Sequence, residues 1–323
     1  MTLIGIDIGG TKCAVSLGEE DGAGGVRLLK KCAPRPTPGR APDELLGELA
    51  ADANALVAAA GGPARALGVS CGGPLDSRRG LVLSPPNLPG WDAVPVCDIL
   101  QRATGLPAFL CNDANAGALA EWRMGAGRGC DNLAFLTFGT GLGAGLILNG
   151  RLYEGACDFA GELGHIRLAD DGPAGYGKLG SFEGFCSGGG IAQLSGAYLR
   201  REYQQGHHPA LCPSPQDLGA VDAKAVGLAA AAGDPLACEI MEKCGQMLGR
   251  GLAILIDLLN PQRIIIGSIF ARSRAQLWPA AQAVLQRECL PAALAACEVL
   301  PCGLTESVGD LAALTVAAYR LGL

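Results

Sequence analysis

The pattern of apolar and polar positions predicts short buried strands that alternate with helices. Helical spacing of apolar residues predicts helices at 43–60, with Asp43 as N-cap, at 114–122 and at 307–323. Apolar runs bounded by glycine or polar residues predict strands at 3–8, 13–17, 66–70, 108–111, 133–137, 144–148 and 263–266. The alternation favours an α/β fold.

Two regions lack these periodicities. Segment 84–91 has three prolines and a glycine, which predict a stiff loop, and segment 155–190 is glycine-rich with few periodic signals.

A strand–glycine turn–strand pattern occurs at 4–17 and again at 133–148. With 323 residues, the chain is too long for one ordinary core. We therefore expect a duplicated fold with two domains and a cleft between them.

Composition and charge narrow the classes of function. Hydrophobic residues make up 49% and charged residues 17%, which is typical of a chain with a sizeable core. The net charge is −6, and no basic tract of five residues occurs, so we expect neither nucleic acid nor membrane partners. The N-terminus has no basic region of a signal peptide, and the 14 scattered cysteines form no CxxC pair. We therefore expect reduced thiols and a cytoplasmic location.

The first motif with chemical meaning is DIGGTK, at residues 7–12. Gly9 and Gly10 allow backbone N–H groups to approach phosphate oxygens, while Thr11 adds a hydroxyl and Lys12 a charge. Asp7 lies at the end of the preceding strand, next to its last residue, where it can hold Mg²⁺ through water. The alternative is an ordinary tight β-hairpin.

The second motif is TFGTGLGAG, at residues 137–145, and it offers the same chemistry. Alone, either motif is as consistent with a hairpin as with a phosphate site, but two such turns between apolar strands favour phosphate. Neither motif matches a P-loop or a dinucleotide-binding fingerprint.

Four segments, DIGGTK, NDAN, FGTGLGAG and EGACDFAGELGH, resemble the ROK family of sugar kinases and repressors. The resemblance covers nearly the whole chain and is most specific over 112–165. It implies the actin-like, ribonuclease H-like two-domain ATPase fold with an interdomain cleft. The smaller domain is expected at 1–113 with about 307–323, and the larger at 114–306.

The resemblance also implies roles for individual residues. Asp113 corresponds to the family's catalytic base for the sugar 6-hydroxyl, a role open to a carboxylate within hydrogen-bond reach. The alternative is that Asn112 and Asp113 only cap the following helix, and for Asn87 it is turn chemistry. Sugar-binding roles are implied for Gly73, Asn87, Asn112, Asp113, Glu162, His165 and Glu183, and nucleotide-binding roles for Asp7, Gly9, Gly10, Thr11, Lys12, Gly139, Thr140, Gly141 and Gly267.

Two departures from the family pattern stand out. Most members hold a structural zinc with the motif histidine and three cysteines, but here the cysteine positions are Ala174, Tyr176 and Ser181. Structural zinc needs about four ligands, so we expect no zinc and a loop anchored by Tyr176, Phe182 and Phe185. After Gly267, Ser268-Ile269-Phe270 stands where family members often have glycines near the adenosine. This departure concerns the pocket for the nucleotide base and therefore the preference for ATP over other phosphoryl donors.

Together these features predict an ATP- and Mg²⁺-dependent kinase for a hexose or an N-acylhexosamine, similar to a glucokinase. One alternative is a sugar-binding regulator without catalysis. The presence of both Asp7 and Asp113 argues against this alternative. Another is a sugar-responsive repressor, which would carry a helix-turn-helix before the phosphate motif; here the strand that leads into that motif begins at Leu3. Family members are commonly dimers, so a homodimer is expected.

Overall fold

The computed structural model describes residues 1–22 and 24–323, which divide into two compact units. Unit 1 comprises Met1–Asp131, Gly145–Ala160 and Gly303–Leu323, and unit 2 comprises Asn132–Ala144 and Gly161–Cys302. The chain thus crosses between the units four times, at other places than the domain bounds predicted from the sequence. Those bounds stay a prediction.

Unit 1 is built on a mixed sheet in the order β3-β2-β1-β5-β8, with β4 paired to β2. Strands β1, β5 and β8 run parallel, whereas β2 runs antiparallel to β1 and to β3. The strands are β1 (Thr2–Ile8), β2 (Lys12–Glu20), β3 (Val26–Lys31), β4 (Arg35–Pro36), β5 (Ala64–Cys71) and β8 (Ala108–Asn112).

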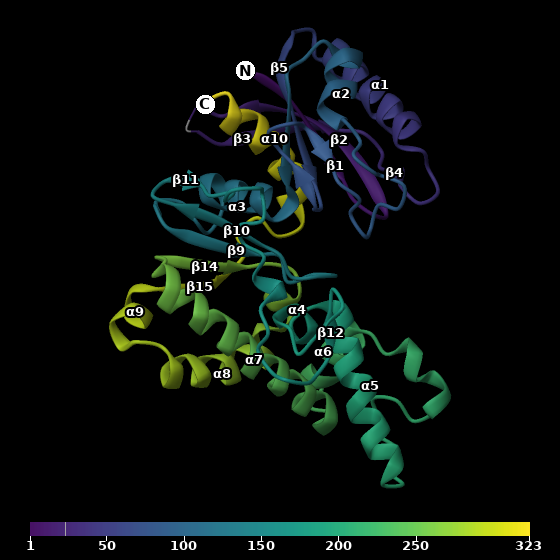
Figure 1. The fold of residues 1–323 in the computed structure, drawn as a ribbon, viewed down its shortest axis with the longest axis vertical. Helices are drawn as coiled ribbons and strands as arrows, with labels where there is room; N and C mark the ends of the chain where they lie inside the picture. Colours follow the sequence, from purple (N-terminus) through teal and green to yellow (C-terminus); the bar gives the residue numbers. More distant parts are fainter. Residues whose placement is uncertain (23) are drawn as a thin grey trace. The chain divides into compact units, whose positions relative to one another are not determined.

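Helices cover both faces of this sheet (Figure 1). Helices α1 (Pro42–Ala60) and α2 (Val96–Thr104) pack on one face over a large apolar core that includes Leu45, Leu49 and Trp91. Helix α10 (Val308–Arg320) packs through Leu314 and Ala317 on a second core, and α3 (Asp113–Met124) lies beside it. The shorter elements of unit 1 are β6 (Leu75–Asp76), β7 (Leu81–Val82), β11 (Arg151–Leu152), the 3-10 turn Thr305–Ser307, and β10 (Ala144–Leu148) from its second residue onward.

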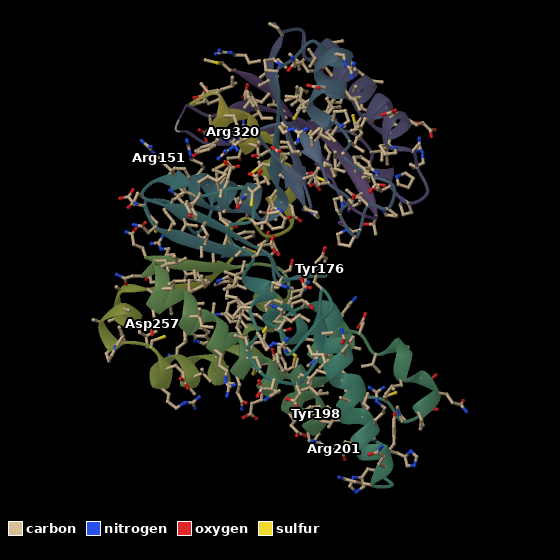
Figure 2. All side chains as sticks on the ribbon, in the orientation of Figure 1. Arg151, Tyr176, Tyr198, Arg201, Asp257 and Arg320 are labelled. Atoms are coloured by element: carbon tan, nitrogen blue, oxygen red, sulfur yellow. The ribbon has the colours of Figure 1, made fainter. Side chains whose placement is uncertain are left out.

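Unit 2 contains a parallel arrangement of β9 (Leu133–Leu136), β14 (Arg263–Ile266) and β15 (Glu298–Pro301), with β14 in the middle. Its long helices are α5 (Gly188–Gln204), α7 (Pro235–Leu259) and α8 (Ile269–Glu288). Arg201 of α5 stacks on Tyr198 at 4.7 Å and pairs with Glu239 of α7, which ties these two helices together (Figure 2). The shorter elements are β12 (Ala174–Gly175), β13 (Lys178–Leu179), α4 (Phe182–Phe185), α6 (Ala223–Ala231), α9 (Pro291–Ala296) and the 3-10 turns Leu163–His165 and Pro215–Ala220.

The predicted strands and helices are confirmed within a few residues, and 84–91 forms no helix or strand. The N-cap prediction for Asp43 is wrong: α1 begins at Pro42, with Ala41 as N-cap and no side-chain cap. Proline at the first helical position needs no donor there, and Asp43 instead lies in the first turn. Helix α5 begins inside the segment where the sequence shows no helical period. Among the described residues, no helix is both long and apolar enough to cross a membrane.

Candidate functional site

In unit 1, the predicted site residues follow three neighbouring parallel strands. The register pairs Ile8 of β1 with Cys71 of β5, and Cys71 with Asn112 of β8. The Gly9-Gly10 turn, the Gly72-Gly73 turn and Asp113 therefore lie at the same edge of the sheet. The carboxyl ends of parallel strands are where open α/β sheets bind ligands.

Asp7 is the last but one residue of β1 and is partly buried. Burial, and next the negative charge of Asp113, raise the pKa of the Asp7 carboxyl from 3.8 to about 6, against the opposing effect of a hydrogen bond from Ser70. Two carboxylates close enough to repel one another create a place where a cation is favoured. The structure thus fits the predicted role of Asp7 near a divalent ion.

Thr37 supports the Gly9-Gly10 turn with two hydrogen bonds. Gly9 N–H donates to the Lys12 carbonyl at 3.1 Å, and the Thr37 hydroxyl donates to the Gly9 carbonyl at 2.7 Å. Thr37 N–H also donates to the Thr11 carbonyl at 3.1 Å. Thr37 is buried, whereas Thr11 and Lys12 are exposed. The turn is therefore fixed on one side and open to a ligand on the other.

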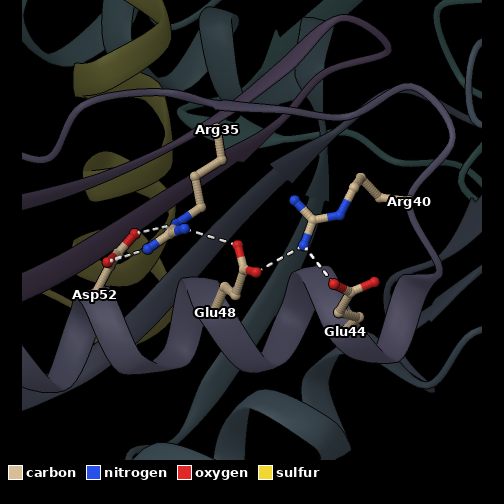
Figure 3. Close-up of polar contacts among 5 residues, drawn as sticks. All are labelled: Arg35, Arg40, Glu44, Glu48 and Asp52. Atoms are coloured by element: carbon tan, nitrogen blue, oxygen red, sulfur yellow. Dashed lines mark hydrogen bonds and ion pairs between the residues drawn. The ribbon is translucent and has the colours of Figure 1, made fainter.

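Two arginines tie the segment around Thr37 to helix α1 (Figure 3). Arg35 donates to both carboxylate oxygens of Asp52, at 2.6 and 2.8 Å, and to Glu48 at 2.7 Å. Arg40 donates to Glu48 at 2.7 Å and to Glu44 at 3.0 Å. Glu48 thus joins the two arginines, and a bidentate guanidinium–carboxylate pair restricts geometry more than a lysine could. Sequence reasoning missed this support, although Arg35 and Arg40 flank Thr37.

Asn87 lies between two of the glycine turns. A Cβ on Gly10 would come within 2.6 Å of the Asn87 carbonyl, and a Cβ on Gly72 would lie 3.4 Å from its Nδ2. Glycine at position 10 is therefore required by this close approach. Gly10, Thr37, Arg40 and Asn87 also line a pocket of about 390 Å³ within unit 1.

Asn112 and Asp113 open helix α3. The Asn112 side chain caps the helix by accepting from Ala114 N–H at 3.0 Å, as expected if Asn112 and Asp113 act as helix caps. Asp113 Oδ1 accepts from the same N–H at 2.8 Å, and Oδ2 faces Gly72. Burial among surrounding atoms raises the pKa of the Asp113 carboxyl, although part of the residue is exposed. Capping fixes this carboxylate and does not compete with a role as a base.

In unit 2, residues 137–143 of the second glycine motif form a turn that is closed by its own backbone hydrogen bonds. Thr137 N–H donates to the Gly143 carbonyl at 3.0 Å, and Gly139 N–H donates to the Gly141 carbonyl at 2.9 Å. Glu183 Oε2 accepts from Leu142 N–H at 2.9 Å, and a Cβ on Gly141 would lie 2.7 Å from that oxygen. Glu183 is thus joined to the second glycine motif.

Gly267 follows β14 and leads into helix α8. Its N–H donates to the Leu136 carbonyl at 2.9 Å, at the end of the neighbouring strand β9. Ser268 adopts φ 48° and ψ −106°, a conformation suited to glycine, and lies beside Gly139. The departure at Ser268 therefore puts a residue with a strained backbone next to the predicted nucleotide turn. Thr140 of that turn is exposed.

Glu162 and His165 lie at the 3-10 turn Leu163–His165, and both are exposed. The His165 ring meets Tyr176 edge-on, with centroids 6.2 Å apart. Phe182 and Phe185 are buried, as predicted for anchors of the loop. The same prediction is wrong for Tyr176, which is 69% exposed because its turn directs it outward.

The residues at the family's zinc positions do not fit a metal. The Ser181 hydroxyl is buried and bonded to two backbone N–H groups, of Gly175 and Gly184. Within residues 1–22 and 24–323, no three His, Cys, Asp or Glu side chains come together as metal ligands. The predicted absence of zinc stays a prediction.

The predicted residues thus form two sets, each assembled within one unit. Unit 1 brings together Asp7, Gly9, Gly10, Gly73, Asn87, Asn112 and Asp113, and unit 2 brings together Gly139, Gly141, Glu183 and Gly267. Thr37 and Ser70 are additions that only the fold reveals. The cleft expected between the halves stays a prediction.

Known proteins resemble this chain along its whole length. A glucokinase from Thermotoga maritima is 33% identical over all of this chain and 99% of its own, and an N-acetylmannosamine kinase from Escherichia fergusonii is 31% identical over 83% and 82%. Among solved structures, a ROK hexokinase from Thermus thermophilus matches with a TM-score of 0.81 and 32% identity over 100% of this chain and 99% of its own. A ROK family glucokinase from Streptomyces griseus in complex with glucose and AMPPNP matches with 0.75 and 29%, over 99% and 100%.

The ROK family profile matches residues 3–317. This match and the relatives confirm the resemblance carried by the glycine turns and the 112–165 motifs. The fold is accordingly the actin-like two-domain α/β fold of these sugar kinases. The chain belongs to the ROK family.

Proposed function

We propose that this chain transfers the terminal phosphoryl group of ATP to the 6-hydroxyl of a hexose or an N-acylhexosamine. The observation that carries the proposal is the common sheet edge of unit 1, where Asp7 and the Gly9-Gly10 turn lie at the end of β1 and Asp113 follows β8, with the parallel strand β5 between them. Phosphoryl transfer needs positioned phosphate donors, charge neutralisation and a proton acceptor. This edge offers a candidate for each, and the relatives named above are sugar kinases.

Asp113 is the proposed base. Its Oδ1 is held by Ala114 N–H, so that Oδ2 can accept the proton of the sugar hydroxyl as the new bond to phosphorus forms. The surrounding protein atoms raise its pKa, which makes the carboxylate a stronger proton acceptor than one with an ordinary pKa. Asn112 is proposed to bind a neighbouring hydroxyl with its amide N–H₂ while its oxygen caps α3.

Asp7 is proposed to bind the divalent ion that accompanies ATP. Mg²⁺ supplies charge neutralisation on the transferred phosphate, and it keeps much of its water shell when a carboxylate holds it. The raised pKa of Asp7 fits this role, because a nearby cation favours the ionised form that burial and Asp113 disfavour. The backbone of Gly9, Gly10, Gly139 and Gly141 is proposed to contact the phosphates, with Thr11, Lys12 and Thr140 beside it.

Glu162, His165 and Glu183 are proposed to bind the ring hydroxyls of the sugar, since carboxylates and imidazoles bond such groups directionally. Asn87 and Gly73, in unit 1, are also proposed to bind the sugar. A cytoplasmic location and a homodimer remain proposals of the same kind. Within residues 1–22 and 24–323, none of the fourteen cysteines forms a disulfide, which is consistent with a reducing compartment.

The test of the base is Asp113→Asn. We expect turnover to fall by about 10²–10⁴-fold, while the sugar dissociation constant measured by calorimetry changes little. Comparable loss of turnover and of sugar binding would contradict the assignment. The variant keeps a polar side chain at the start of α3, so its thermal midpoint serves as the control for folding.

A panel of hexoses and N-acylhexosamines in one ADP-release assay tests the function as a whole. Sugar-dependent ADP release is expected for at least one member. Sugar binding without ADP release would favour the catalytically inactive regulator. Sugar-dependent retardation of DNA at low salt would favour the repressor.

A further inference from the structure

The turn between β12 and β13 has an unusual backbone. Its two residues, Tyr176 and Gly177, both have positive φ angles, of 46° and 75°. Two-residue hairpin turns of this kind favour Asn-Gly or Gly-Gly, because a bulky side chain is strained there. Tyr176 is also 69% exposed, so burial offers little compensation (Figure 2). A strained, exposed aromatic residue indicates a role outside the turn itself.

The contact that Tyr176 makes is with His165. The two rings meet edge-on, with centroids 6.2 Å apart and an angle of 78° between the planes. Lys178, on the far side of the same turn, donates from Nζ to the His165 carbonyl at 2.8 Å. The turn therefore holds both the ring and the backbone of His165.

Hydrogen bonds organise the base of this turn. Ser181 Oγ accepts from Gly175 N–H at 3.2 Å and from Gly184 N–H at 3.1 Å. Gln193 of α5 donates to the Ala174 carbonyl at 2.9 Å and accepts from Ala174 N–H at 3.0 Å. Ala174, Tyr176 and Ser181 are the positions that the family resemblance assigns to zinc cysteines, and none of them offers a thiolate ligand.

This strand segment also continues toward Glu183. Ser181 caps the short helix α4, on which Glu183 lies, and Phe182 N–H donates to the Ile166 carbonyl at 2.8 Å. The Ser181 hydroxyl thus stands at a junction between the turn beside His165 and the helix that carries Glu183.

We propose that this turn replaces the family's zinc site with a metal-free support, in which Tyr176 is the positioning residue for the His165 imidazole. The inference rests on the proposed function in one respect, because it assigns His165 to the sugar. The edge-on ring contact sets the plane of the imidazole, and the Ser181 and Gln193 hydrogen bonds hold the turn that presents Tyr176.

The kinetic test compares Tyr176→Gly with Tyr176→Phe in the full chain. Tyr176→Gly removes the ring and relieves the backbone strain, so its thermal midpoint should equal or exceed that of the unmodified protein. Its KM for the best sugar should rise about twofold to tenfold, the effect of losing one aromatic contact, with kcat unchanged. Tyr176→Phe keeps the ring edge and should restore the original KM. An unchanged KM in Tyr176→Gly would overturn the proposal.

A second readout needs no activity. The chain has three histidines, and His165→Gln identifies the His165 imidazole resonances in a proton spectrum. Tyr176→Gly should shift those resonances through loss of the ring current, and should leave His207 and His208 in place. A chelator should shift none of them, and metal analysis should find no stoichiometric zinc.

These outcomes separate the two proposals. If the unmodified protein phosphorylates no sugar, the proposed function fails, while the resonances and the metal analysis still decide the support of His165. Stoichiometric zinc, or His165 resonances that do not respond to Tyr176→Gly, would refute the metal-free support even in an active kinase.

Discussion

Replacing Asp7 by asparagine should make the ligand-free protein more stable while it abolishes turnover. The Asp7 carboxyl is partly buried and faces the negative charge of Asp113, so its ionised form is disfavoured in the folded chain. Asparagine has the same shape, cannot ionise and keeps an oxygen that can accept the Ser70 hydrogen bond. The substitution therefore removes a negative charge that destabilises the folded protein when no cation is bound.

The magnitude follows from the pKa. The pKa is about 6 in the folded chain against an ordinary 3.8. At about 1.36 kcal/mol per pH unit, this difference corresponds to about 3 kcal/mol. Because the folded pKa is the higher one, protonation favours the folded state. The stabilisation by protonation is complete below pH 3.8 and is lost as the pH rises through about 6.

Denaturant unfolding at two pH values measures this effect. We expect the free energy of unfolding of Asp7→Asn to exceed that of the unmodified protein by about 3 kcal/mol at pH 7.5 and by roughly half as much at pH 5. Asp43→Asn makes the same chemical change at an exposed position of α1 and should alter stability by only about 0.5 kcal/mol. MgATP should stabilise the unmodified protein and not Asp7→Asn.

Two results would refute this reasoning. One is an Asp7→Asn protein that is no more stable than the unmodified chain at pH 7.5. The other is a stability difference that does not shrink between pH 7.5 and pH 5, because the gain would then have a cause other than ionisation. Full turnover by Asp7→Asn would separately remove Asp7 from the proposed ion site.

Three further predictions concern the supports of the glycine turns. Gly10→Ala places a Cβ 2.6 Å from the Asn87 carbonyl, so kcat/KM in the ADP-release assay should fall by about tenfold or more; an unchanged value would show that the turn yields freely. Arg35→Lys breaks the bidentate bond to Asp52 and should cost about 1 kcal/mol of stability in urea unfolding; equal stability would show that the pair is dispensable. Ser268→Gly relieves the strained backbone at φ 48° and should raise stability by about 1 kcal/mol; a lower thermal midpoint would contradict the strain.

Local features of the site could be predicted from neighbouring residues alone. An apolar run at 3–8 that leads into Gly9-Gly10 indicates a strand followed by a tight turn, and β1 does end at Ile8, just before those glycines. Asn112 before an apolar helical stretch indicates an N-cap, and its side chain does cap α3. Such predictions succeed because strand alternation, capping and turn formation depend on contacts within a few residues.

Predictions from the sequence failed where two local preferences compete at neighbouring positions. Asp43 is a good capping residue, but Pro42 is better suited to the first helical turn, so the helix starts one residue earlier. Three glycines at 188–190 suppress any helical signal, yet α5 begins there with Ser187 as its N-cap. An aromatic residue such as Tyr176 is expected in the core, but Tyr176 lies in a turn with a positive φ angle and its side chain is exposed to solvent.

The alternation of strands and helices, the two glycine turns and the family motifs can be predicted from the amino-acid sequence, because each depends on residues close together along the chain. The groups that support those turns are known only from the folded chain. Thr37 bonds to Gly9 across 28 residues, and Glu183 bonds to Leu142 across 41. Periodicity reports which face of an element is buried, but the partner of a side chain depends on which distant loops the folded chain brings together.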